Sequence, residues 1–144
     1  MNEIRIVGIG SPFGADRLGW LVIEALRQNP PEADLIVCRQ PAELPSLLAG
    51  CRRAVLVDAL LGGHPPGTLL KFGPDALPEA GLGVSSHGFG VSAAVRLAAT
   101  LGTLPAELVV LALEVGNPER EPAPEWIGRL AQAAQQESII QLID

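Results

Sequence analysis

The sequence predicts an α/β fold: a single three-layer domain over residues 1–144, with a twisted, mostly parallel five-stranded sheet and helices on both faces. Three observations predict it. Short apolar runs rich in β-branched residues alternate with segments of helical periodicity, the pattern of βαβ units with right-handed crossovers. The runs show no apolar–polar alternation, as expected for strands buried on both faces of a parallel sheet. Finally, 48% of the 144 residues are hydrophobic and 18% are charged, a composition typical of a compact globular domain.

The first half of the chain contains three predicted strands and two predicted helices. The strands are the apolar runs at residues 4–7, 35–38 and 55–57. The first helix, at 17–28, has apolar side chains at i, i+3 and i+4 spacing and ends at the NPP sequence that follows, since proline cannot continue a helix. A shorter helix is predicted at 42–49.

The second half contains two more strands and two longer helices. The run at 108–113 is nearly continuous and predicts a buried strand, whereas the weaker pattern at 68–72 places a strand nearer an edge of the sheet. An alanine-rich segment predicts a helix over 91–101. The last helix, over 126–142, has apolar residues along one side and a proline near its start.

Charge and hydropathy exclude several classes of function. The formal net charge is −6, and no stretch collects enough Lys and Arg to neutralise a phosphate backbone, so we expect no nucleic-acid partner. The one basic doublet, Arg52-Arg53, is expected at the surface. No window approaches the roughly 18 apolar residues of a membrane span, and the first residues lack the features of a signal peptide. Since two cysteines make no disulfide framework, we expect a soluble, cytoplasmic protein.

The segment GIGSPFGADRLGW, directly after the first apolar run, shares part of the glycine pattern of a dinucleotide-binding loop. That loop needs Gly-x-Gly-x-x-Gly so that backbone N–H groups can approach a pyrophosphate at a helix start. Here Gly8 and Gly10 fit, but Phe13 stands at the third glycine position. Pro12 removes an N–H, and Asp16 would place a negative charge close to a bound phosphate. The pattern therefore favours a turn that presents Asp16.

Three side chains form the candidate site. Asp16 follows the first strand, Asp58 ends the run AVLVD, and His87 lies in SSHGFG just before the third predicted helix. In an open α/β sheet, ligands bind beyond the carboxyl ends of the strands, where we expect these side chains to meet. Two carboxylates and an imidazole suit a divalent transition metal such as nickel, zinc or iron. Each residue also has an ordinary structural role open to it: helix N-cap for Asp16, turn cap for Asp58, and backbone-bonded loop histidine for His87.

GIGSPFGADRLG, VDAL and SSHGFG, in this order along the chain, resemble the three signatures of the nickel–iron hydrogenase maturation endopeptidases. The resemblance runs nearly the full length. It implies an enzyme that removes the C-terminal extension of a hydrogenase large-subunit precursor already loaded with nickel. It also implies that Asp16, Asp58 and His87 are catalytic and bind the substrate's nickel, with no permanent cofactor. A metal bound in this way polarises the scissile carbonyl and positions a water.

The first motif departs from the family pattern in three ways. Ser11 stands where asparagine is usual, Ala15 replaces the first of two acidic residues, and the loop is one residue short. An alternative alignment matches Asp16 to that first acidic residue and puts Arg17 in the ligand position. We prefer the gapped alignment because it keeps Gly19 in register.

Other roles stay open from the sequence. An aspartic-protease dyad, in which Asp16 and Asp58 share a proton, leaves His87 without a role. A non-catalytic module that binds a nickel protein is the alternative suggested by the altered first loop. A nucleotide-binding α/β domain is a third possibility. Segments 73–86 and 119–124 are candidates for contacting a protein substrate.

Overall fold

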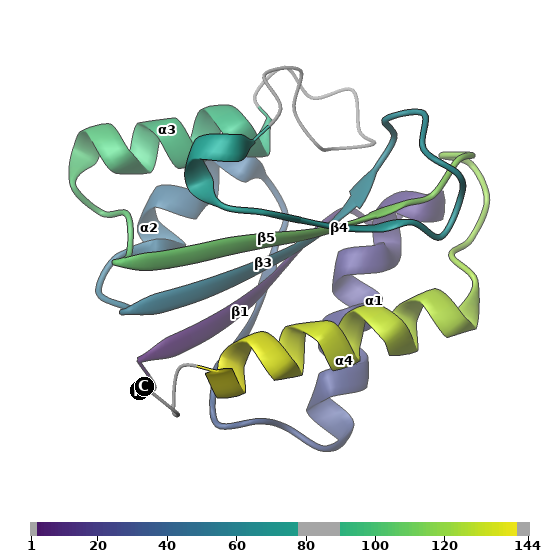
Figure 1. Ribbon diagram of the computed structural model, residues 1–144, viewed down its shortest axis with the longest axis horizontal. Helices are drawn as coiled ribbons and strands as arrows, with labels where there is room; N and C mark the ends of the chain where they lie inside the picture. Colours follow the sequence, from purple (N-terminus) through teal and green to yellow (C-terminus); the bar gives the residue numbers. More distant parts are fainter. Residues whose placement is uncertain (1–2, 78–89, 141–144) are drawn as a thin grey trace.

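The computed structural model describes residues 3–77 and 90–140. In these ranges the chain forms a five-stranded sheet in the order β2-β1-β3-β5-β4 (Figure 1). Four strands run parallel to one another: β1 (Ile4–Ile9), β2 (Asp34–Cys38), β3 (Arg53–Leu60) and β5 (Glu107–Glu114). The fifth, β4 (Leu69–Phe72), pairs antiparallel with β5. The mostly parallel sheet is thus confirmed, and its weakest predicted strand lies at the edge.

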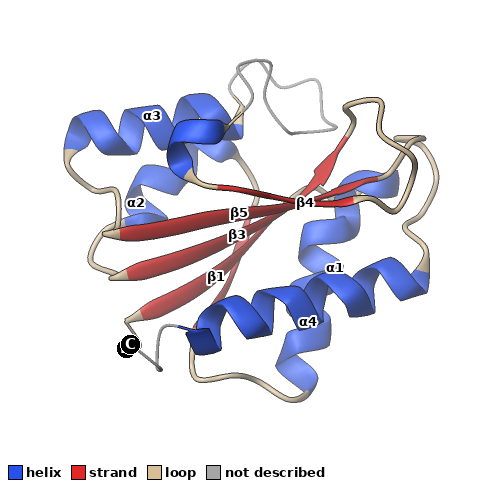
Figure 2. Ribbon diagram, in the orientation of Figure 1, coloured by secondary structure: helices blue, strands red, loops and turns tan. Residues whose placement is uncertain are grey.

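Helices cover both faces of the sheet and give the molecule three layers (Figure 2). On one face lie α1 (Leu18–Gln28) and α4 (Pro124–Ile140), which contact each other. On the other face lie α2 (Leu44–Leu48) and α3 (Val91–Leu101), which also form a contacting pair. Within the described residues, no helix is long and apolar enough to cross a membrane.

Each face of the sheet has its own hydrophobic core, because side chains alternate between the two faces along a strand. On the α1–α4 face, Ile6 and Val57 are fully buried together with Leu18 of α1. On the opposite face, Val7 and Leu56 are fully buried within the second core. All eight residues of β3 are buried, which explains why the sequence shows an apolar run there without alternation.

The predicted elements match the structure to within two residues at most boundaries, and α3 has the predicted bounds. β3 is longer than expected because Ala59 and Leu60 continue the parallel ladder with β5. A 3₁₀ turn, Gly14–Arg17, precedes α1, so the α-helix begins one residue later than predicted. The predicted end of the last helix, at residue 142, lies outside the described residues.

The prediction that both residues of the Arg52-Arg53 doublet lie at the surface is wrong for Arg53. Its guanidinium is buried under α4, with Nη2 2.7 Å from Glu137 Oε1 and Nε donating to the Glu137 carbonyl at 2.9 Å. Lys71 of β4 adds a second cation, 2.7 Å from Glu137 Oε2. A charge can be buried here because it is paired and hydrogen-bonded, and the pairing attaches α4 to the sheet.

Candidate active site

The glycines of the first motif allow β1 and α1 to approach closely. A Cβ atom at Gly8 would collide with the carbonyl oxygen of Gly19, and a Cβ at Gly19 would collide with that of Ile9. A Cβ at Gly10 would collide with the carbonyl oxygen of Asp16, which accepts a hydrogen bond from the N–H of Ser11 at 3.0 Å. The glycine pattern therefore packs a helix on a strand and folds the turn, without any need for a phosphate.

Asp16 lies in the 3₁₀ turn between β1 and α1 and is 8% exposed. The turn starts with Gly14 at φ +52°, and the N–H of Ala15 donates to the carbonyl of Pro118 at 3.0 Å. Asp16 is not the N-cap of either helical segment, because Phe13 and Arg17 occupy those positions, and neither segment has a side-chain cap. The ordinary capping role considered for Asp16 is therefore excluded.

Asp58 lies inside β3, two residues before its end, and not at the end of the strand as predicted. It alternates with Leu56 and Leu60, so its side chain faces α2 and α3. The carboxyl is 1% exposed; its Oδ1 accepts a hydrogen bond from the N–H of Ala59 at 2.8 Å. Its Oδ2 is buried and has no hydrogen-bond partner among the described residues.

The two aspartates lie close enough for the charge of Asp16 to affect the ionisation of Asp58. Burial raises the pKa of Asp58 well above its ordinary value, the negative charge of Asp16 raises it further, and the Ala59 N–H offsets part of the rise. The structure thus brings together Asp16 and Asp58, from the turn after β1 and the last part of β3. His87 lies outside the described residues, and within them no group of three or more His, Cys, Asp or Glu side chains is arranged to hold a metal ion.

Glu114, at the end of β5, is a residue of this region that the sequence analysis missed. Its side chain is fully buried, and its Oε1 accepts hydrogen bonds from the N–H groups of Gly62 at 2.8 Å and His64 at 3.1 Å. Its Oε2 accepts from the N–H of Gly116 at 3.1 Å. Burial alone would raise the pKa of Glu114, but these N–H donors outweigh it and the pKa is lowered, so the carboxylate is charged.

The role of Glu114 is to hold together the loops that follow β3 and β5. Gly62 and His64 belong to the first loop and Gly116 to the second. The sequence signal that could have identified Glu114 is the one that identified Asp58: an acidic residue stands at the end of a nearly continuous apolar run. The run at 108–113 is followed directly by Glu114.

The thiol of Cys38, near the carboxyl end of β2, is unsuited to act as a nucleophile. Its side chain is fully buried and donates to the carbonyl of Gln40 at 3.1 Å. Burial raises its pKa to about 12, with a further contribution from the negative charge of Glu43. Since the thiolate is the reactive form of cysteine, this thiol is inert at neutral pH.

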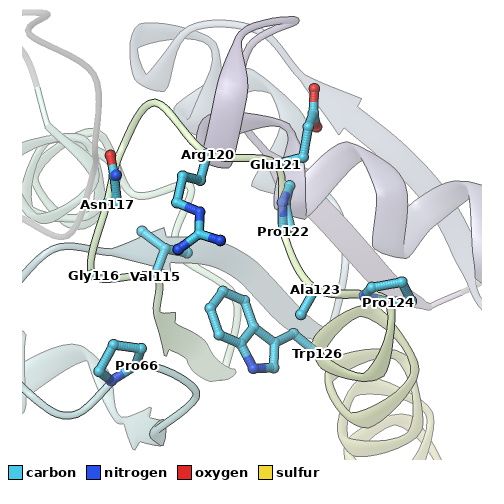
Figure 3. Close-up of a pocket in the computed structure, with 10 residues that line it drawn as sticks. All are labelled: Pro66, Val115, Gly116, Asn117, Arg120, Glu121, Pro122, Ala123, Pro124 and Trp126. Atoms are coloured by element: carbon cyan, nitrogen blue, oxygen red, sulfur yellow. The ribbon is translucent and has the colours of Figure 1, made fainter.

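A pocket of about 530 Å³ lies beside the turn that carries Asp16 (Figure 3). Most of its lining comes from residues 115–123, the segment between β5 and α4, and the remainder from Pro66 and from Pro124 and Trp126 of α4. The hydrogen bond from Ala15 to Pro118 joins this segment to the turn. Arg17 binds Glu121 at 2.9 Å and makes a second connection between them.

Comparison with known proteins gives a consistent result. Residues 26–137 match the model of the hydrogenase maturation protease family HycI, a range that includes Asp58 and His87 but not Asp16. A search of curated proteins finds no match.

Several solved structures have a similar fold. The hydrogenase maturating endopeptidase HybD from E. coli is 19% identical, with 99% of this chain and 92% of that chain covered and a TM-score of 0.71. The endopeptidase HycI from Escherichia coli is 18% identical, with 96% and 92% covered and a TM-score of 0.70. The [NiFe] hydrogenase maturation protease HycI from Thermococcus kodakarensis is 23% identical, with 95% and 90% covered and a TM-score of 0.65.

The structural likeness, at these identities, establishes the fold: a mostly parallel α/β sheet like that of the HybD and HycI proteases. The family model establishes more, because it spans more than half of the chain. This protein therefore belongs to the hydrogenase maturation protease family and is a peptidase.

Proposed function

We propose that this protein is an endopeptidase that removes the C-terminal extension from a hydrogenase large-subunit precursor, and that it acts on the precursor already loaded with nickel. The observation that carries the proposal is the Asp58 carboxyl. One of its oxygens is held by the Ala59 N–H, while the other is buried without a partner in the described part of the chain. An unpartnered buried polar atom costs about 1–3 kcal/mol, so such atoms are concentrated where a ligand supplies the partner.

The chemistry of the two aspartates fits a divalent cation supplied by the substrate. A cation between Asp16 and Asp58 removes the repulsion that raises the Asp58 pKa and gives Oδ2 its missing partner. Carboxylate oxygens together with an imidazole, for which His87 is the candidate, form a donor set suited to nickel. In this proposal the three residues bind the substrate's nickel, and the protein keeps no permanent metal.

Hydrolysis then needs a polarised carbonyl and a base for the attacking water. The substrate's nickel, held by the aspartates, polarises the scissile carbonyl. The aspartate carboxylate that is not fully engaged takes a proton from the water, which attacks the carbonyl carbon. Cleavage of the C–N bond is completed by transfer of a proton to the leaving amine. The scarcity of water around Asp58, which is 1% exposed, strengthens these electrostatic effects.

Mass spectrometry of a nickel-loaded precursor, before and after incubation with this protein, tests the proposal. We expect loss of the C-terminal extension with the wild type, no cleavage of the nickel-free precursor, and no cleavage by Asp58→Asn or His87→Ala. Glu24→Gln is the matched control, because Glu24 is an exposed carboxylate on α1, outside the two segments expected to contact the substrate. Full activity of the Asp58 and His87 variants would rule out the proposal.

The altered first loop suggests a second candidate function. Ser11 and Ala15 depart from the family pattern on the turn that carries Asp16. A wild-type protein that binds the loaded precursor tightly but releases no product would be a non-catalytic binding module. The same mass-spectrometric assay, combined with a pull-down of the precursor, distinguishes the two functions.

A further inference from the structure

The pocket between β5 and α4 is not used by any step of the reaction described above. Six of its lining residues define its character: Pro66, Val115, Asn117, Arg120, Glu121 and Trp126. Figure 3 shows the Arg120 side chain reaching over Val115 with its guanidinium directed toward the Trp126 ring. The ring itself is half-buried and packs against the core under the sheet. The pocket therefore combines an apolar floor with one cationic group.

The charge of the pocket is positive although the chain as a whole carries a net charge of −6. Glu121 is the one acidic residue in its lining, and both of its oxygens accept hydrogen bonds from Arg17 at 2.9 Å. Its charge is thereby neutralised. The Arg120 guanidinium, in contrast, makes no hydrogen bond or ion pair with any described residue; only its backbone N–H is engaged, by Asn117. One unneutralised cation remains.

The pocket is attached to both parts of the candidate active site. Pro118 accepts a hydrogen bond from Ala15, which directly precedes Asp16. Glu114 binds the N–H of Gly116 with one oxygen and the N–H of Gly62, in the loop after Asp58 and its strand, with the other. The segment that lines the pocket is therefore hydrogen-bonded to the turn that carries Asp16 and, through Glu114, to the loop that follows β3.

We propose that this pocket binds an acidic side chain of the polypeptide substrate, Asp or Glu, together with its apolar neighbour, a few residues from the scissile bond. This proposal rests on the proposed peptidase function and names a subsite for it. A guanidinium forms strong, paired hydrogen bonds with a carboxylate. The ring of Trp126 and the rings of the lining prolines accept the apolar neighbour. We assign the carboxylate to a side chain, and a peptide with a free carboxyl end distinguishes this assignment from a chain terminus.

Nuclear magnetic resonance titration tests the subsite without any cleavage. The chain has two tryptophans, so its two indole N–H signals can be followed; that of Trp20, bonded to the Cys38 carbonyl at 3.2 Å, is the internal reference. The probes are acetyl-Leu-Glu-Leu-amide and acetyl-Leu-Gln-Leu-amide. We expect saturable shifts at Trp126 and a preference of about threefold to fivefold for the glutamate peptide, the effect of an exposed ion pair. Arg120→Met should abolish the preference.

Arg96→Met is the matched control, because Arg96 is an exposed arginine on α3, across the sheet from the pocket. Arg96→Met should keep the wild-type preference, and Arg120→Met should raise the KM for the precursor with kcat nearly unchanged. Equal affinity of the wild type for the two peptides, or a preference that survives Arg120→Met, would overturn the proposal. So would stronger binding of acetyl-Leu-Gln-Leu with a free carboxyl end, which would assign the pocket to a chain terminus.

The two proposals fail in different ways. If the wild-type protein prefers the glutamate peptide but never cleaves the precursor, the subsite proposal stands and the proposed peptidase reaction is refuted. If Arg120→Met cleaves the precursor with normal kinetics and the wild type shows no peptide preference, the peptidase proposal stands and the subsite proposal is refuted. Because Arg120 is exposed, its variant is expected to fold, which thermal melting by circular dichroism checks.

Discussion

Replacing Asp58 with asparagine removes an ionisable group from the candidate site while preserving the size and shape of the side chain. The asparagine Oδ1 can still accept the hydrogen bond that the Ala59 N–H donates at 2.8 Å. The amide nitrogen takes the place of Oδ2, which is buried and has no partner among the described residues. We expect this variant to lose cleavage activity and, at the same time, to gain stability. Opposite effects of this kind are typical of residues retained for function.

The expected gain in stability depends on pH, and its sign follows from the raised pKa of Asp58. The folded state keeps the Asp58 carboxyl protonated to a higher pH than the unfolded chain, which ionises it at its ordinary pKa. Protonated Asp58 therefore contributes stability in acid that is lost as pH rises from the ordinary toward the raised pKa. The loss amounts to about 1.4 kcal/mol per pH unit within that window. Asparagine cannot ionise, so the variant should be more stable than wild type at pH 8, and by more than at pH 4.

Urea denaturation of the wild type and Asp58→Asn, from pH 4 to pH 8, measures this difference. Asp75→Asn serves as the control, because Asp75 is exposed and its replacement should change the free energy of unfolding by less than about 0.5 kcal/mol. The free-energy difference between Asp58→Asn and wild type should grow with pH and be smallest at pH 4. A variant that is no more stable than wild type at pH 8 would refute the argument that burial and Asp16 disfavour the charged carboxyl.

Three further predictions concern the parts of the structure that position the site. Glu137→Ala should cost about 1.5–3 kcal/mol in urea denaturation, because the buried Arg53 loses its nearest carboxylate and keeps only Glu107, at 3.5 Å. Glu3→Ala removes only an exposed ion pair and should cost less than about 1 kcal/mol. Glu114→Gln should lower the free energy of unfolding by about 1–3 kcal/mol, because the new amide donor faces a backbone N–H. Since the pKa of Glu114 is lowered in the folded wild type, this cost should shrink as pH falls through the lowered pKa. A cost that does not change with pH would contradict a charged Glu114 carboxylate held by N–H groups. Gly8→Ala should cost about 1–3 kcal/mol, because its Cβ meets α1 backbone, while Gly73→Ala, with open space around it, should be close to neutral in thermal melting.

The sequence alone was enough to predict the order of strands and helices along the chain. Apolar runs and helical spacing are local properties, and they are read without knowledge of the partner elements. The run at 108–113 predicted β5, and the alanine-rich segment predicted α3 with its observed bounds. The three motifs also predicted the family, which the family model confirms. The roles of Asp16, Asp58 and His87 stay predictions.

The tertiary structure decided which of these elements meet, because that depends on register and on contacts between distant residues. Burial of Arg53 could not be foreseen from the doublet, since its partner Glu137 is 84 residues away. The function of Glu114 likewise depends on N–H groups from two loops, and the subsite at Arg120 depends on a pocket formed by separate segments. Hydrophobic patterning determines which residues are buried, but a polar residue has a partner only after the loops at the strand ends are folded together.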